Sequence, residues 1–90
     1  MTDFAAAAEQ LRALHHPPDV LVLANAWDAA SARAVEGAGF PAVATSSGAV
    51  ARVLGEGDSD SMGADLALAA VARVAAAVSV PVTADVEAGY

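Results

Sequence analysis

Three short apolar segments, each followed by polar residues, constrain the fold of this chain most strongly. They are VLVLANA at 20–26, PAVATSSG at 41–48 and VPVTADVEAGY at 80–90. Such runs of β-branched residues and leucine are typical of buried parallel strands. Ahead of each segment, alanine-rich stretches with apolar residues at helical spacing predict helices. The resulting helix–strand alternation leaves connections long enough for parallel crossovers.

Two architectures place helices between parallel strands: an open doubly wound sheet and a (β/α)8 barrel. In both, ligands bind at the carboxyl ends of the strands. All three segments are polar at that end, with NAWD at 25–28, TSSG at 45–48 and DVE at 85–87. No linker or change in composition divides the chain, so we expect residues 1–90 to belong to a single domain.

Charge and apolar patterning limit the classes of partner. The 90 residues include eleven acidic and four basic ones, which gives a formal net charge of −7, and there is no cysteine. Nucleic acids and anionic membranes attract clustered cations, so we expect neither as a partner. The first residues lack the pattern of a signal peptide, and no apolar run is long enough to span a bilayer. These features predict a cytoplasmic protein.

Two acids spaced two residues apart, Asp85 and Glu87, end the third segment. If the strand continues through them, both side chains share one face, with backbones about 6.6 Å apart. Two carboxylates about 6 Å apart repel by about 3 kcal/mol at an effective dielectric near 20. A divalent metal such as Mg²⁺, a neighbouring cation or protonation of one acid would offset this repulsion. The alternative is that the strand ends near residue 85 and both acids are solvated loop residues.

Other polar groups are open to ordinary structural interpretations. TSSG at 45–48 can present hydroxyls and backbone N–H groups to an anion, but an ordinary turn fits equally well. The acid-rich loop at 54–63 lacks the glycine and the final acid of a calcium-binding loop. His15 and His16 are expected to interact with the end of the first helix.

Four motifs follow one another in a specific order. They are NAWDAASAR at 25–33, AGFPAVATSS at 38–47, LG-x-x-D at 54–58 and D-x-E-x-G-Y at 85–90. Together they resemble the isocitrate lyase/phosphoenolpyruvate mutase superfamily, from about residue 14 to the last residue. The resemblance implies an α/β fold: the N-terminal part of a (β/α)8 barrel, comprising a leading helix and the first three β/α units. A barrel of this type needs about 250 residues, so we expect the chain to be the N-terminal portion of a longer enzyme.

The same resemblance implies a Mg²⁺-dependent enzyme, with Mn²⁺ as an alternative metal. Such enzymes make or break C–C or P–C bonds in small 2-oxo or 2-hydroxy acids through an enolate-like intermediate. The implied partners are a small anionic oxo acid and, for the full-length protein, further copies of itself. The lyase, mutase, hydrolase and decarboxylase branches are not separated, because the loop that distinguishes them corresponds to sequence after residue 90.

Position by position, the resemblance also implies roles for three acids. Asp85 corresponds to the direct metal ligand, and Glu87 to a second metal-site acid that acts through water. Many family members have Asp at the second position, and the longer Glu87 changes that geometry. Asp58 corresponds to a catalytic loop acid that reaches the water shell of the metal or the substrate.

The substrate-binding residues implied by the resemblance lie in the second segment. Ser46, together with the backbone N–H groups of Ser47 and Gly48, corresponds to the holder of a substrate carboxylate or phosphoryl group. Many members have glycine directly after the matching serine, where this chain has Ser47. Two other functions stay open: a catalytically inactive truncated product, and a small doubly wound domain that binds a ligand through TSSG without a metal.

Overall fold

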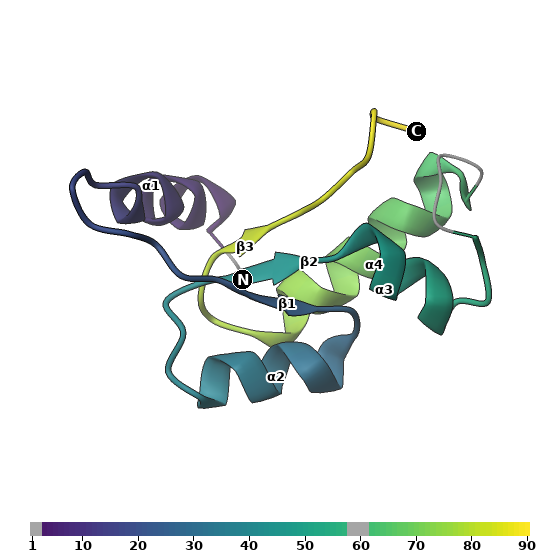
Figure 1. Cartoon of the computed structure of the whole chain (residues 1–90), viewed down its shortest axis with the longest axis horizontal. Coiled ribbons are helices and arrows are strands. Elements are labelled where there is room, and N and C mark those ends of the chain that lie inside the picture. Colours follow the sequence, from purple (N-terminus) through teal and green to yellow (C-terminus); the bar gives the residue numbers. More distant parts are fainter. Residues whose placement is uncertain (1–2, 58–61) are drawn as a thin grey trace.

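The structure, a computed structural model, describes residues 3–57 and 62–90. In these residues three parallel strands form one sheet in the order β1-β2-β3, with helices between them (Figure 1). The elements in chain order are α1 (Phe4–Leu14), β1 (Ala24–Ala26), α2 (Ala29–Gly37), β2 (Val43–Thr45), α3 (Ser47–Val53), α4 (Ala64–Ala77) and β3 (Val82–Thr83). This order confirms the predicted alternation and adds one short helix, α3.

The register of the sheet aligns the carboxyl ends of neighbouring strands. Ala26 of β1 is paired with Thr45 of β2, and Ala44 of β2 is paired with Thr83 of β3. Because all three strands run in the same direction, the residues that follow them emerge at one edge of the sheet. The polar ends of the second and third segments are thereby brought close together.

The strands are shorter than the apolar segments that contain them. Residues 20–23 precede β1 and are not buried as predicted, since Val20 and Val22 are 85% and 62% exposed. Among the described residues, β1 has a strand neighbour on only one side, so little covers its apolar flank. The third strand ends at Thr83, and the second gives way to α3, which contains Ser47 and Gly48.

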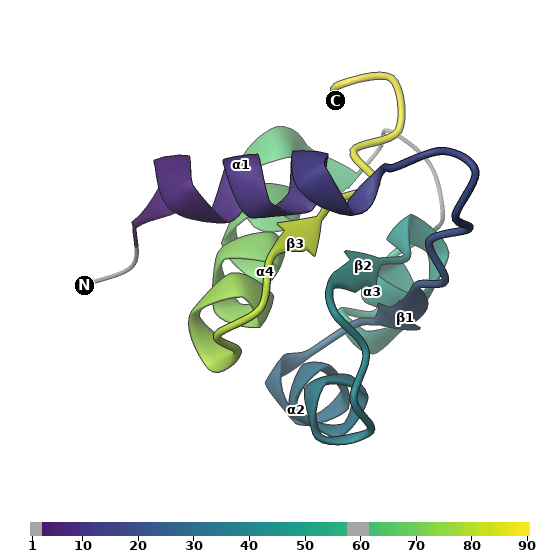
Figure 2. The same cartoon turned by 90° about the vertical axis from the view of Figure 1, so that its left-hand side faces the viewer.

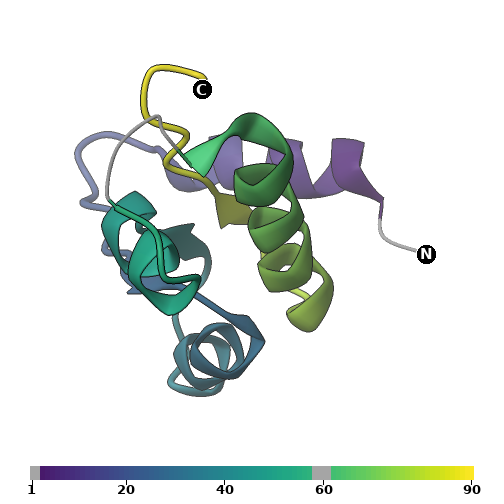
Figure 3. The same cartoon turned by 90° about the vertical axis from the view of Figure 1, so that its right-hand side faces the viewer.

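Helices α2 and α4 pack together and cover the sheet, as Figure 3 shows. The main core cluster is made of small side chains: Ala26, Ala32, Val43 and Val74 are all completely buried. A second cluster lies between α3 and α4 and consists of Val50, Ala51, Met62 and Ala67, with Tyr90 packed against it. The segment after β3 thus ends in contact with this second cluster.

Helix α1 lies beside β3, the last strand of the sheet (Figure 2). Asp3 begins it, its side chain accepting a hydrogen bond from the N–H of Ala6 at 2.9 Å. At its other end, Nδ1 of His15 lies 2.8 Å from the carbonyl oxygen of Leu11, which confirms the predicted interaction of this histidine with the helix end. Within the part of the chain that the structure describes, no helix is both long and apolar enough to cross a bilayer.

Candidate functional site

The segment after β3 is joined to the end of β2 through Asp85. The backbone N–H of Asp85 donates to Oγ1 of Thr45 at 3.1 Å. The Asp85 carboxylate in turn accepts hydrogen bonds from the hydroxyl and the backbone N–H of Ser47. Thr45 and Ser47 are buried, with 5% and 9% of their surface exposed, whereas Asp85 is exposed. The polar ends predicted for two different strands therefore meet in one place.

Asp85 and Glu87 do not continue the strand, which ends at Thr83, so the alternative of two exposed loop acids holds and the shared strand face does not. The backbone N–H of Glu87 donates to Oδ1 of Asp85 at 3.0 Å, and Glu87 has a φ of 53°. The N–H of Gly89 then donates to the carbonyl of Val86 at 2.8 Å, which closes a turn. Beyond Thr83 the backbone leaves the sheet ladder: the Asp85 N–H bonds to a side chain of β2, and the Glu87 and Gly89 N–H groups bond within the segment. Both acids are exposed loop residues.

These contacts favour the ionised form of Asp85. The pKa of its carboxyl is lowered from the ordinary value of 3.8, first by the hydrogen bond from the Glu87 N–H and then by those from Ser47. Hydrogen bonds to a carboxylate stabilise its charged form over the neutral one. At neutral pH the site therefore presents a fixed negative charge at the end of the sheet.

The other residues predicted from the sequence, where the structure describes them, are not among those hydrogen-bonded to Asp85. Ser46 is the N-cap of α3, and its Oγ accepts a hydrogen bond from the N–H of Ala49 at 3.4 Å. Gly48 lies in the first turn of that helix and is half-buried. Asp58 lies outside the described residues. Thr45 was not singled out from the sequence, although its position at the last residue of a strand is a signal that could have indicated it.

The chemistry of the donor set agrees with a magnesium ion. Mg²⁺ usually binds through one or two carboxylates and takes waters or substrate oxygens for its other positions. Asp85 and Glu87 supply two exposed carboxylates two residues apart. Among residues 3–57 and 62–90, no three His, Cys, Asp or Glu side chains are grouped closely enough to hold a metal ion. The residues present thus fit a magnesium site of the open kind, completed by water and substrate.

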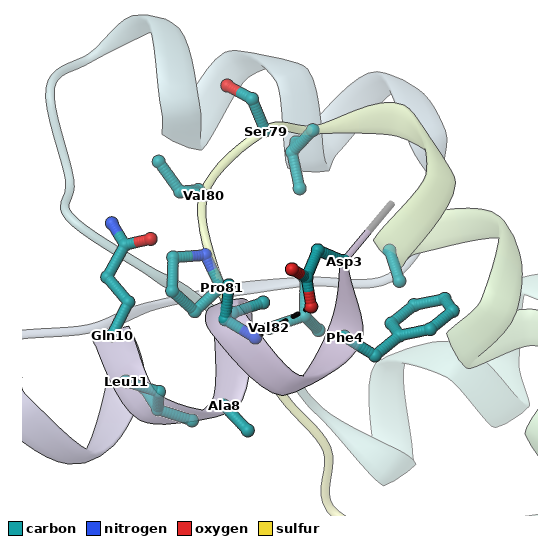
Figure 4. A pocket seen from close by; sticks show the side chains of 13 residues that line it. Asp3, Phe4, Ala8, Gln10, Leu11, Ser79, Val80, Pro81 and Val82 are labelled. Carbon is teal, nitrogen blue, oxygen red and sulfur yellow. Dashed lines mark hydrogen bonds between the residues drawn. The ribbon is translucent and has the colours of Figure 1, made fainter. Parts of the chain in front are cut away.

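A cavity of about 670 Å³ lies elsewhere, between α1 and the amino end of β3. Figure 4 shows Phe4 and Leu11 of α1 on one side of it and Val80 and Pro81 on the other. Its lining is largely apolar, and the carboxylate of Asp3 at its edge already caps α1. Because chemically reactive groups are sparse here, we place the candidate site at the carboxyl ends of β2 and β3 instead.

Comparison with solved structures supports the fold described above. Two solved structures from Burkholderia cenocepacia J2315 match closely. One is named a phosphonomutase (TM-score 0.89, 40% identity, covering 93% of this chain and 34% of the other). The second is named a lyase/mutase (TM-score 0.87, 41% identity, covering 96% and 31%). A phosphoenolpyruvate phosphomutase from Streptomyces platensis subsp. rosaceus matches with a TM-score of 0.85 and 36% identity, covering 93% and 29%.

The chain therefore spans about a third of the length of these relatives. No curated protein matches it significantly. The α/β fold class is confirmed as part of a (β/α)8 barrel, since the superposition on barrel proteins covers nearly all of the chain. The family model for phosphoenolpyruvate phosphomutase matches residues 11–90. The chain belongs to the phosphoenolpyruvate phosphomutase family, within the superfamily that its motifs resemble.

Proposed function

We propose that this chain supplies the metal-binding acids and part of the substrate cradle of a Mg²⁺-dependent enzyme. The enzyme would act on C–C or P–C bonds of small 2-oxo or 2-hydroxy acids through an enolate-like intermediate. One observation carries the proposal: Asp85, after β3, is hydrogen-bonded to Thr45 and Ser47 at the end of β2. Within a chain of this family, that contact joins the predicted metal ligand to the predicted substrate-binding turn.

The charges of these residues explain why a cation is needed. Asp85 and Glu87 are exposed acids in a chain of net charge −7, and an anionic oxo acid would be repelled by them. Bound Mg²⁺ would supply Lewis-acid stabilisation of negative charge on the substrate. Asp85, with its carboxylate oriented by three hydrogen bonds, would be the direct ligand. Glu87 would be the second metal-site acid, acting through a water, with Mn²⁺ as the alternative metal.

The substrate would be held by the end of β2 and the start of α3. Ser46 caps α3 and is half-buried, and Gly48 lies in the first turn of the same helix. In the proposal these two residues contact the carboxylate or phosphoryl group of the acid. Asp58 would act as the catalytic loop acid, and the full-length enzyme would form a homo-oligomer.

A chimera tests the proposal. The chain replaces the matching third of the Burkholderia cenocepacia phosphonomutase, to which it is 40% identical. Turnover of phosphoenolpyruvate and of small 2-hydroxy acids is followed with and without Mg²⁺. We expect the chimera to keep the metal-dependent activity of its parent, and Asp85→Asn to lower kcat/KM by about 100-fold or more, as loss of a transition-state contact does.

The matched control is Asp65→Asn, which removes the same charge from an exposed position in the first turn of α4. It should leave activity unchanged. A chimera whose Asp85→Asn variant works as well as its parent, or whose activity ignores chelation of the metal, would contradict the proposal. The TM-scores of 0.85 and above to proteins three times longer favour this function over a small doubly wound domain.

A further inference from the structure

We propose that Ser47 and Thr45 are positioning residues that fix Asp85, and that Ser47 is not a substrate contact. The inference rests on the proposed function in one respect, namely that Asp85 is a metal ligand. It also changes the set of residues that can bind an anionic substrate. Three structural facts carry it: the direction of the hydrogen bonds, the burial of both hydroxyl residues and the number of donors that Ser47 possesses.

The hydrogen bonds fix Asp85 at both its backbone and its side chain. Oγ1 of Thr45 accepts from the Asp85 N–H at 3.1 Å, which ties the main chain after β3 to β2 where the sheet ladder has already ended. Ser47 then donates to the carboxylate from its hydroxyl and its N–H, while Glu87 donates from its N–H at 3.0 Å. A carboxylate otherwise rotates in a broad well about its last torsion, so donors from two different segments are needed to orient it.

The donor count of Ser47 excludes a second role in anion binding. A serine has one hydroxyl proton and one backbone N–H to donate. Both are directed at Asp85. Since the carboxylate of an oxo or hydroxy acid only accepts hydrogen bonds, Ser47 has no donor left for that group while it holds Asp85. The anion-binding role that the family resemblance implies for this turn therefore falls to Ser46 and Gly48.

The same bonds also restrict where a cation can approach. A carboxylate offers about four lone-pair positions on its two oxygens. Three donors already point at Asp85, two from Ser47 and one from Glu87. About one position is therefore left for a metal ion. Because Thr45 and Ser47 are buried and Asp85 is exposed, a metal ion would have to approach Asp85 from the solvent side.

Amide hydrogen exchange and Mn²⁺ binding on the 90-residue chain test the inference. Exchange of the Asp85 and Glu87 amides is measured by NMR without metal, and the Mn²⁺ affinity is measured by electron paramagnetic resonance. We expect Thr45→Val to speed exchange at Asp85, and Ser47→Ala to speed it at Glu87, each about three- to tenfold. Either variant should weaken Mn²⁺ binding about tenfold, as loss of an outer-shell partner does.

Three further variants separate positioning from general stability. Ser79→Ala removes another serine hydroxyl bond to a carboxylate, the 2.7 Å contact with Glu36, at the far end of the sheet. It should change neither readout. The conservative variants Ser47→Thr and Thr45→Ser keep the hydroxyls and should restore wild-type exchange and affinity.

Each outcome bears on a distinct claim. If Ser47→Ala and Thr45→Val leave both exchange and Mn²⁺ affinity as in the wild type, the positioning inference is wrong. Equal weakening of Mn²⁺ binding by Ser79→Ala would also overturn it, because the effect would then be one of stability. A third outcome separates the two proposals. If Ser47→Ala and Thr45→Val speed amide exchange, but the wild-type chain and Asp85→Asn bind Mn²⁺ equally, then Ser47 and Thr45 do position Asp85. In that case Asp85 is not a metal ligand, and the metal role in the proposed function is wrong.

Discussion

Ser31 illustrates how a single hydroxyl can settle the role of a polar strand end. Its Oγ accepts hydrogen bonds from the N–H groups of Trp27 at 2.9 Å and Asp28 at 3.1 Å. Asp28 accepts in return from the Ser31 N–H at 2.7 Å, which lowers the pKa of the Asp28 carboxyl. This reciprocal pair is a capping box that begins α2. The acid after β1 is therefore committed to a helix start, whereas the acid after β3 is placed against another strand.

The capping role predicts a measurable loss of stability. Replacing Ser31 with alanine removes the acceptor for two N–H groups at the start of α2, and loss of such a cap costs about 1 kcal/mol. We expect Ser31→Ala to lower the free energy of unfolding by about that amount in urea denaturation. Ser31→Thr, which keeps the hydroxyl, is the matched control. Equal stability of Ser31→Ala and wild type would show that the box is not needed.

At the scale of elements, Glu36 links α2 to the connection between α4 and β3. Its Oε2 accepts from the Ser79 N–H and the Ser79 hydroxyl, both at 2.7 Å, and from the Val80 N–H at 3.3 Å. These groups would otherwise lack a partner in the ladder, since β3 begins only at Val82. The contact fixes where the chain enters the connection that leads into the last strand.

The Glu36 contact predicts a pH dependence of stability. Its pKa is lowered from 4.5, first by the Ser79 hydroxyl and then by the Ser79 N–H, so the folded state binds this proton less readily than the unfolded state. The stabilisation is present above pH 4.5 and is lost as the pH falls through the lower folded value. We expect Glu36→Gln to reduce the fall in Tm between about pH 6 and pH 3.

The control for this titration is Glu9→Gln, the same change at an exposed position on α1, 4.0 Å from Arg12. It should leave the pH dependence close to that of the wild type, because exposed ion pairs contribute little. If both variants flatten the curve equally, the effect comes from net charge rather than from the Ser79 contact.

Element order could be predicted from the sequence, but element length could not. Apolar periodicity indicates that 20–26 is suited to a strand, yet a residue is in the ladder only where a partner strand lies opposite. The paired stretch here is Ala24–Ala26. Helix α3 was missed because serine and glycine favour turns locally, while Ser46 in this fold serves as a helix cap.

At the scale of the whole molecule, the interior is built from small side chains and many large ones stay outside. Val43 and Val74 are the largest fully buried aliphatic side chains, while Phe4, Val20 and Leu68 are more than half exposed. A cavity of about 320 Å³ opens between Val20–Val22 and residues 38–41, the segments that lead into β1 and β2. Apolar side chains next to an open strand edge favour association with another chain.

This exposure predicts that a charge near the β1 edge reduces self-association. Val22 is 62% exposed, and we expect Val22→Lys to weaken self-association of the chain about tenfold in sedimentation equilibrium, the effect of losing one buried aliphatic contact. Leu68→Lys is the control, since Leu68 is exposed on α4, away from the edge. Equal weakening by both substitutions would indicate a general charge effect instead.

The candidate site was predictable in its composition more than in its geometry. The sequence indicates that the ends of β2 and β3 meet, because parallel strands bring their carboxyl ends to one edge. It does not show that Glu87 takes a positive φ or that its N–H bonds to Asp85, since both depend on the turn closed by Gly89. Nor does the sequence show that both Ser47 donors bond to Asp85, because the two residues are far apart in the chain.

The segment at 85–90 is held at both ends, by Thr45 and Ser47 at Asp85 and by the second core cluster at Tyr90. Its conformational entropy is therefore lost when the chain folds and not when a ligand arrives. A loop free to move would impose an ordering cost of about 1–2 kcal/mol per residue at the moment of binding. In the proposed metal site, a cation would meet a segment that is already ordered, so its binding would not have to include that ordering cost.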